Sequence, residues 1–333
     1  MNAVLLTASF AVILAGAVVF TNAVEWLGHR LDVGQGAVGS LLAAVGTAMP
    51  ETLIPIVAIL GAAEGAEDVA IGAIVGAPFL LATIAMMLVG LSALGYRRRR
   101  PQGRALSAHI ETLERDLGFF LLFFALGLVL GLGASSAVRI GAAVIFCLAY
   151  AYYVRRTLLS GGDVQAEDTL GPLMFDRRPG RRGPPPLTAI LLQFGIGLGA
   201  IVGGAHLFVE ELIHVAGSLG VEPLILSLIL APLATELPEK ANSFFWIRDG
   251  KDSLALGNIT GAMVFQSTLP VAFGLAFTQW DLHSQAVLSI CLGLAGGVVA
   301  YWALRLRGQF NALAIVLWGA LYAAFLVAVL VGG

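Results

Sequence analysis

Ten long apolar segments constrain the fold of this chain more than any other feature of its sequence. Each is long enough to cross roughly 30 Å of hydrocarbon, which takes about 20 helical residues. They lie at approximately residues 3–24, 38–61, 68–95, 117–133, 136–154, 188–216, 222–246, 253–279, 284–304 and 310–331. Hydrophobic residues make up 58% of the chain and charged residues 12%, which is typical of a polytopic membrane protein. The sequence therefore predicts an all-α membrane protein with ten transmembrane helices.

Lysine and arginine residues are concentrated in alternate loops between these segments. Of the 19 basic residues, all but Arg139 and Lys240 fall on one side of the membrane when the loops are placed alternately. Cytoplasmic loops are enriched in basic residues, so we expect this side to be cytoplasmic. Both termini are then predicted to lie outside, and we expect the plasma (inner) membrane as the location.

Two similar six-residue motifs, called frames below, lie within the apolar segments. Residues 46–51 read GTAMPE and residues 234–239 read ATELPE, and each frame is followed by a glycine-rich apolar run, at residues 70–76 and 255–261. The chain therefore contains an internal repeat. Each half holds five spans, an odd number, so the second copy is predicted to enter the membrane upside down relative to the first. Inverted repeats of this kind commonly build transporter sites near the middle of the bilayer.

The repeat divides the chain into three parts. Residues 1–157 form the predicted first membrane repeat, and residues 188–333 form the second. Residues 158–187 between them are rich in glycine, proline and charged side chains, so they are interpreted as a solvated cytoplasmic linker.

Glu51 and Glu239 close the two frames, and carboxylates inside lipid are costly enough to indicate a function. Pro50 and Pro238 cannot donate a backbone hydrogen bond, so each is expected to free the carbonyl four residues earlier. A threonine four residues before each glutamate shares its helix face. Hard cations, above all calcium, prefer such all-oxygen sites. The predicted cation ligands are Glu51, Glu239, Thr47, Thr235 and the carbonyls of Gly46 and Ala234.

The charge of these two glutamates favours ion exchange. Two ionised carboxylates in a low-dielectric site repel each other unless a divalent ion or protons neutralise them. Ca²⁺ and two protons are therefore natural competitors for Glu51 and Glu239, the predicted metal ligands. Competition at one shared site is sufficient for antiport if the protein changes its open side only when that site is neutralised.

The two frames, together with the Gly-x-x-x-Gly runs at residues 72–76 and 257–261, resemble the alpha repeats of the cation/calcium exchanger superfamily, most closely its prokaryotic sodium/calcium exchanger branch. The resemblance implies a cation antiporter that works by alternating access. The family's calcium-binding glutamates match Glu51 and Glu239, and its neighbouring threonines match Thr47 and Thr235.

The chain departs from the family pattern at several positions. Ala48 and Glu236 stand where the family usually has serine, and the polar residues that follow the first glycine run in the family are replaced by residues 77–81, which read APFLL. Two candidate sodium ligands are thus altered. The counter-ion, Na⁺ or H⁺, stays open at this point.

Four further polar residues are possible accessory groups. Glu236 and Lys240 are four residues apart in the order that favours a helical ion pair. Alternatively, the Lys240 ammonium takes the position of a monovalent cation, or Glu236 carries a proton. Asn258 and Gln266 are oxygen donors that remain near the second frame.

Other functional classes fit the sequence less well. It contains no nucleophile–base pair and no His-Glu-x-x-His helix, so no enzyme is predicted. Cys147 and Cys291 indicate neither a disulfide framework nor a metal site. The expected partners are inorganic cations and the bilayer, with no nucleic acid, no inferred protein partner and no cofactor besides the transported Ca²⁺ and Na⁺ or H⁺. A cation channel and a non-transporting structural relative are the remaining alternatives.

Overall fold

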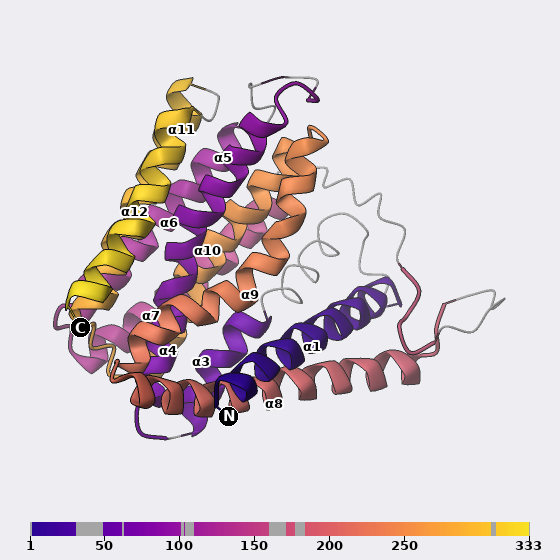
Figure 1. Ribbon diagram of the computed structural model, residues 1–333. Coiled ribbons are helices and arrows are strands. Elements are labelled where there is room, and N and C mark those ends of the chain that lie inside the picture. Colours follow the sequence, from indigo (N-terminus) through magenta and orange to yellow (C-terminus); the bar gives the residue numbers. More distant parts are fainter. Residues whose placement is uncertain are drawn as a thin grey trace.

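The computed structural model describes residues 2–30, 49–61, 63–100, 103, 110–159, 171–176, 184–307 and 311–332. All regular secondary structure in these ranges is helical (Figure 1). Seven of the described helical stretches are long and apolar enough to cross a membrane, namely Asn2–Arg30, Ala66–Gly95, Ser136–Thr157, Leu187–Leu219, Asp252–Phe277, Ser284–Arg305 and Ala312–Val331. The predicted all-α membrane fold is confirmed to this extent.

The helix ends lie close to the predicted spans. In chain order the elements are α1 (Asn2–Arg30), α3 (Met49–Gly61), α4 (Ala66–Leu80), a π-helix (Leu81–Ala85), α5 (Met86–Gly95), α6 (Ile110–Gly131), α7 (Ser136–Leu159), α8 (Leu187–Leu219), α9 (Pro223–Arg248), α10 (Asp252–Phe277), α11 (Ser284–Arg307) and α12 (Ala312–Gly332). Proline and glycine set several boundaries: α9 begins at Pro223, and α8 ends at Leu219, directly before Gly220 in the left-handed conformation. The main difference is α6, which begins before the predicted residue 117 and so includes the charged residues 111–116.

Helices α1 and α8 lie side by side along the lower side of the molecule in Figure 1, oblique to the other helices. Glycines permit their close approach, since a Cβ added at Gly197 would meet the backbone of Phe20 at 2.7 Å, and one at Gly204 would meet Ile13 at 2.8 Å. In contrast, Gly195, Gly199 and Gly203 of α8 are exposed. Close packing therefore follows one face of α8 only.

Helix α4 crosses α9 with the two backbones in contact. A Cβ at Gly72 would lie 2.6 Å from the Leu224 carbonyl oxygen, and one at Gly76 would lie 2.5 Å from that of Leu228. The hydroxyl of Ser227 donates a hydrogen bond to the Val69 carbonyl across the same interface, at 2.7 Å. The first glycine run of the sequence thus serves helix packing between the two halves of the chain.

The helix from Ala66 to Gly95 contains a π-helical turn at Leu81–Ala85 that the sequence does not predict. Pro78 lies just before it and cannot donate a backbone hydrogen bond, while the hydroxyl of Thr83 donates to the Phe79 carbonyl at 2.6 Å. Gly296 of α11 packs directly against the carbonyl of Ala82 in this turn. The irregular turn is therefore buried against α11, where no side chain intervenes.

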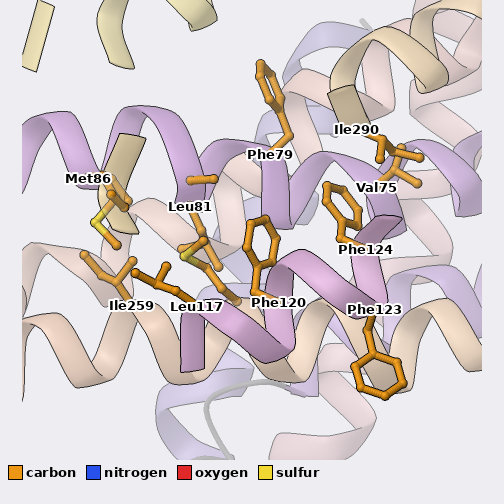
Figure 2. Packing of buried hydrophobic residues seen from close by; sticks show 14 of the residues in the cluster. Val75, Phe79, Leu81, Met86, Leu117, Phe120, Phe123, Phe124, Ile259 and Ile290 are labelled. Atoms are coloured by element: carbon orange, nitrogen blue, oxygen red, sulfur yellow. The ribbon is translucent and has the colours of Figure 1, made fainter. Parts of the chain in front are cut away.

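The largest hydrophobic cluster fills the bundle formed by α4 to α7 and α9 to α12. Figure 2 shows part of it, including Phe79 of α4, Ile259 of α10 and the neighbouring rings of Phe120 and Phe124 of α6. Among the described residues, α1, α3 and α8 contribute nothing to this cluster and pack in two smaller ones. The larger of these two also includes residues of α4 and α9, so the layer made of α1, α3 and α8 packs on these two helices of the main bundle.

Basic residues gather at one end of the main bundle. The end of α5, the α9–α10 turn and the end of α11 all lie at the upper end in Figure 1, and they carry residues 97–100, Arg248, Lys251 and Arg305. Ion pairs link these segments, Arg100 with Asp252 at 2.6 Å and Arg305 with Glu114 at 3.6 Å. Basic loops that alternate along the sequence therefore come together at one end of the folded chain.

Residues 173–175 of the predicted linker lie against α1 and α8. The backbone N–H groups of Met174 and Phe175 donate to the side-chain oxygens of Asn22 on α1 and Gln193 on α8, at 3.1 and 3.0 Å. Leu173, directly before them, is buried at 1% exposure. Gly171, Pro172 and Phe175 are exposed, so the solvated linker stays a prediction, with a short contact to the α1–α8 pair inside it.

Candidate functional site

Glu51 lies in the first turn of α3, and only 6% of it is exposed. Its helix packs against α4 and α8 and also contacts α1, α9 and α10. The carboxylate is thus enclosed where the α1–α3–α8 layer meets helices of the main bundle. Gly46 and Thr47 lie outside the described residues, so their predicted part in the site stays a prediction.

The second frame lies in α9, which continues as a helix from Pro223 to Arg248. Thr235 is 2% exposed, and its hydroxyl donates to the Ala231 carbonyl at 3.1 Å. This donation leaves the lone pairs of the hydroxyl oxygen available to a cation. Pro238 has no N–H to donate to the Ala234 carbonyl, although the helix does not break there. The side chain of Glu239 lies outside what the structure describes.

Glu236, Lys240 and Gln266 form a buried polar group between α9 and α10. The Lys240 ammonium lies 3.5 Å from Oε2 of Glu236, as the four-residue spacing predicts. Lys240 is 3% exposed and Glu236 is 1% exposed. The amide nitrogen of Gln266, from α10, donates a hydrogen bond to Oε1 of Glu236. Glu236 is thus held by a cationic group from its own helix and by a neutral donor from the next.

Asn258 lies at another level of the same helix pair. Its amide nitrogen donates to the hydroxyl of Ser243 at 3.2 Å, and that hydroxyl donates to the Ala255 carbonyl at 3.4 Å. Since α9 and α10 run antiparallel, Asn258 and Ser243 lie roughly 10 Å along the helices from Gln266 and Glu236. The structure therefore places Gln266 with Glu236 and does not place Asn258 there.

A further buried carboxylate, that of Asp116 in α6, was not predicted from the sequence. It is 2% exposed and accepts hydrogen bonds from the hydroxyls of Tyr153 and Thr260, both at 2.9 Å, and from Arg115 at 3.1 Å. Thr260 lies in α10, within the second glycine run. This cluster joins α6, α7 and α10. Its sequence signal is the run Glu114-Arg115-Asp116 directly before an apolar segment.

The Arg100–Asp252 pair was also missed by the sequence reasoning. The NH2 nitrogen of Arg100 and Oδ2 of Asp252 are 2.6 Å apart, and both side chains are fully buried. The pair joins the segment after α5 to the first turn of α10. It lies at the basic end of the bundle, so it contributes to the connection between helices of the two halves.

The other polar side chains that the structure describes form no metal site of His, Cys, Asp and Glu residues. In the ranges given above, no three His, Cys, Asp or Glu side chains converge on one point. His206 and Glu210 of α8 do pair, with Nε2 and Oε1 3.2 Å apart, but both side chains are more than half exposed. Exposure of this kind is typical of polar side chains at a membrane interface.

The chain is similar to known membrane proteins in sequence. A family model described as sodium/calcium exchanger protein matches residues 1–159 and 189–331. The putative antiporter CaxA of Alkalimonas amylolytica is 24% identical over 74% of this chain and 71% of its own length. The inner membrane protein YrbG of Escherichia coli (strain K12) is 24% identical over 75% of this chain and 71% of its own length.

Solved structures share the fold. The H⁺/Ca²⁺ exchanger CAX superposes with a TM-score of 0.72 at 19% identity, over 99% of this chain and 82% of that one. The sodium-calcium exchanger NCX_Mj, soaked with Na⁺ and Sr²⁺, superposes with a TM-score of 0.58 at 19% identity, over 98% of both chains. The likeness spans nearly the whole chain in both comparisons, so the entire helical arrangement is of this kind.

Proposed function

The chain belongs to the sodium/calcium exchanger protein family, and we propose that it is a secondary active antiporter that exchanges Ca²⁺, or a similar divalent cation, for Na⁺ or H⁺. The observation that carries this proposal is the buried Glu51, enclosed where two groups of helices meet. A carboxylate in such a position needs a cation or a proton to neutralise it. The names of its relatives, a putative antiporter and an H⁺/Ca²⁺ exchanger, support the same function.

Glu51 and Glu239 are the proposed ligands of the divalent cation. Thr47 and Thr235, with the carbonyls of Gly46 and Ala234, complete the proposed oxygen shell. The buried position of Thr235 and its free lone pairs support its part. The proposed accessory groups lie close to Glu239 along the chain. Glu236 and Lys240 are within one helical turn of it on α9, and Gln266 of α10 bonds to Glu236, whereas Asn258 lies further away.

The proposed architecture is ten transmembrane helices in two inverted five-helix repeats, residues 1–157 and residues 188–333, with a linker between them. Helix packing supports this arrangement. The helix formed by α4 and α5 contacts α9, α11 and α12, and α10 contacts α3, α6 and α7, which are the elements at the corresponding places in the other half. An inverted repeat requires this exchange of partners.

The proposed topology puts the basic end of the bundle and the linker in the cytoplasm and both termini outside, in the plasma membrane. The clustering of basic residues at one end supports it. The proposed mechanism of alternating access requires that a cation site at Glu51 opens to each side of the membrane in turn.

Glu51→Gln tests the function. This change keeps the shape of the side chain and removes its charge, so we expect ⁴⁵Ca²⁺ uptake into proteoliposomes to fall to the level of empty liposomes, under either a Na⁺ or a proton gradient. Glu64→Gln, at an exposed glutamate between α3 and α4, is the matched control and should keep wild-type uptake. Full activity of folded Glu51→Gln would refute the assignment. Uptake by the wild type that needs no counter-ion would indicate a channel instead, and the absence of uptake would indicate a non-transporting relative.

A further inference from the structure

The chain contains only two lysines, and they differ sharply in environment. Lys251 is exposed at the start of α10, whereas Lys240 is 3% exposed inside α9. Burial of an ammonium group away from water is costly unless an acidic group neutralises it. The position of Lys240 is therefore tied to that of Glu236, its ion-pair partner.

The geometry around Glu236 resembles that of an occupied cation site. One carboxylate oxygen lies 3.5 Å from the positive charge of Lys240, and the other accepts a hydrogen bond from the amide of Gln266 on the neighbouring helix. The carboxylate is 1% exposed, so water does not take either place. A single positive charge therefore already occupies the position beside this carboxylate.

Such an occupant changes what else the position binds. A carboxylate paired with an ammonium group has no remaining net charge to attract a monovalent cation, and the ammonium group repels one. A bound Na⁺ leaves its site in a transport cycle, whereas a lysine side chain is covalently attached and stays. Lys240 thus neutralises Glu236, whose hydrogen bond from Gln266 joins α9 to α10, without an ion from solution.

We propose that Lys240 is a tethered substitute for a monovalent cation at Glu236, so that this protein does not bind or transport Na⁺ there. The consequence for transport rests on the proposed function: the exchanger carries a divalent cation without sodium as its counter-ion. The absence of Na⁺ binding at Glu236 does not depend on whether the protein transports ions.

Cation-dependent thermal stability of the purified protein tests the proposal. The melting temperatures of the wild type, Lys240→Met, the double variant Glu236→Gln/Lys240→Met and the control Lys251→Met are compared in NaCl and in choline chloride at equal ionic strength. The wild type and Lys251→Met should melt at the same temperature in both salts. Lys240→Met should gain a saturable stabilisation by Na⁺, because Glu236 then lacks its cation, and the double variant should lose that gain.

Two outcomes overturn the proposal: stabilisation of the wild type by Na⁺ relative to choline, or a folded Lys240→Met variant that gains nothing from Na⁺. If Lys240→Met does not fold, ²²Na⁺ uptake by wild-type protein into Ca²⁺-loaded proteoliposomes decides. No uptake above empty liposomes is expected, and uptake refutes the proposal. Failure of the antiport function shows separately, as a lack of ⁴⁵Ca²⁺ uptake under both a Na⁺ and a proton gradient.

Discussion

Three buried carboxylates in this protein lie beside a basic side chain: Asp116 beside Arg115, Asp252 beside Arg100, and Glu236 beside Lys240. Each pair reduces the cost of burying its carboxylate among apolar helices. Each of the three carboxylates also links α10 to another element, since Asp252 joins α10 to the segment after α5, and Asp116 and Glu236 each bond to a residue of α10. Helix α10 is thus the element on which the buried charges converge.

Asp252→Ala should be strongly destabilising. It leaves the guanidinium of Arg100 buried without the carboxylate 2.6 Å away, and breaking such a pair typically costs about 3–5 kcal/mol. Unfolding of the purified protein by heat or denaturant measures this change. Asp249→Ala is the matched control, because Asp249 pairs with Arg248 at an exposed position and should cost little. Equal stability of the two variants would contradict the structural role of the buried pair.

Pairs within one helix could be predicted at this scale, and pairs between helices could not. Glu236 and Lys240 are four residues apart, so the period of the helix brings them together. Arg100 and Asp252 are 152 residues apart, and the partners of Asp116 come from α7 and α10. A single sequence carries no local signal for such contacts, and Asp116 in particular was excluded because the predicted span begins at residue 117, after the start of α6 at Ile110.

At the scale of helices, glycine decides how closely the elements approach. Gly72 and Gly76 bring α4 against α9, Gly197 brings α8 against α1, and Gly296 brings α11 against the π-helical turn. In a membrane the attraction between helices depends on close packing of their surfaces, so small residues at these places contribute directly to stability. The glycines also leave no room for larger side chains.

Gly76→Val should destabilise the α4–α9 contact. A Cβ at this position would lie 2.5 Å from the Leu228 carbonyl oxygen, which is backbone and cannot rotate away. Overpacking of this kind typically costs about 1–3 kcal/mol. Gly199→Val, at an exposed position of α8 with no neighbour within 4 Å, is the control for the change in helix propensity. A comparison of melting temperatures checks the prediction, and equal values for the two variants would contradict it.

Helix positions followed from the sequence more closely than their irregularities did. The apolar runs placed the ends of α8 to α12 within a few residues, because the length of a span is fixed by the thickness of the hydrocarbon. The π-helical turn at Leu81–Ala85 depends on packing against α11, and the contact of residues 171–176 depends on Asn22 and Gln193. Both are set by tertiary contacts that no local pattern encodes.

At the scale of the whole molecule, the largest hydrophobic cluster lies in the main bundle, and a smaller one joins the α1–α3–α8 layer to α4 and α9. Alternating access requires two bodies that move relative to each other, and we propose that the layer and the bundle are these bodies. Glu51 belongs to a helix of the layer that contacts α9 and α10 of the bundle. We therefore expect occupation of Glu51 by a cation to affect the contact between the two bodies.

The sequence singles out candidate ligands but not which side chains lie beside them. The repeated frames point to Glu51 and Thr235, and both are buried; their part in a cation site stays a prediction. Whether Asn258 or Gln266 lies near Glu236 depends on the antiparallel register of α9 and α10, which the sequence does not specify. Gly46, Thr47 and the side chain of Glu239 lie outside the described residues, so their contributions stay predictions.

The measurement that most directly tests the central claim, exchange by a carrier at Glu51, is trans-stimulation of ⁴⁵Ca²⁺ uptake. Proteoliposomes with and without internal unlabelled Ca²⁺ are compared at a membrane potential clamped to zero. An antiporter returns to the outward-facing state faster with an ion bound, so internal Ca²⁺ should accelerate uptake by the wild type and by Glu64→Gln, and should have no effect on Glu51→Gln. Uptake by the wild type that is unchanged by internal Ca²⁺, or acceleration retained in Glu51→Gln, would contradict the account.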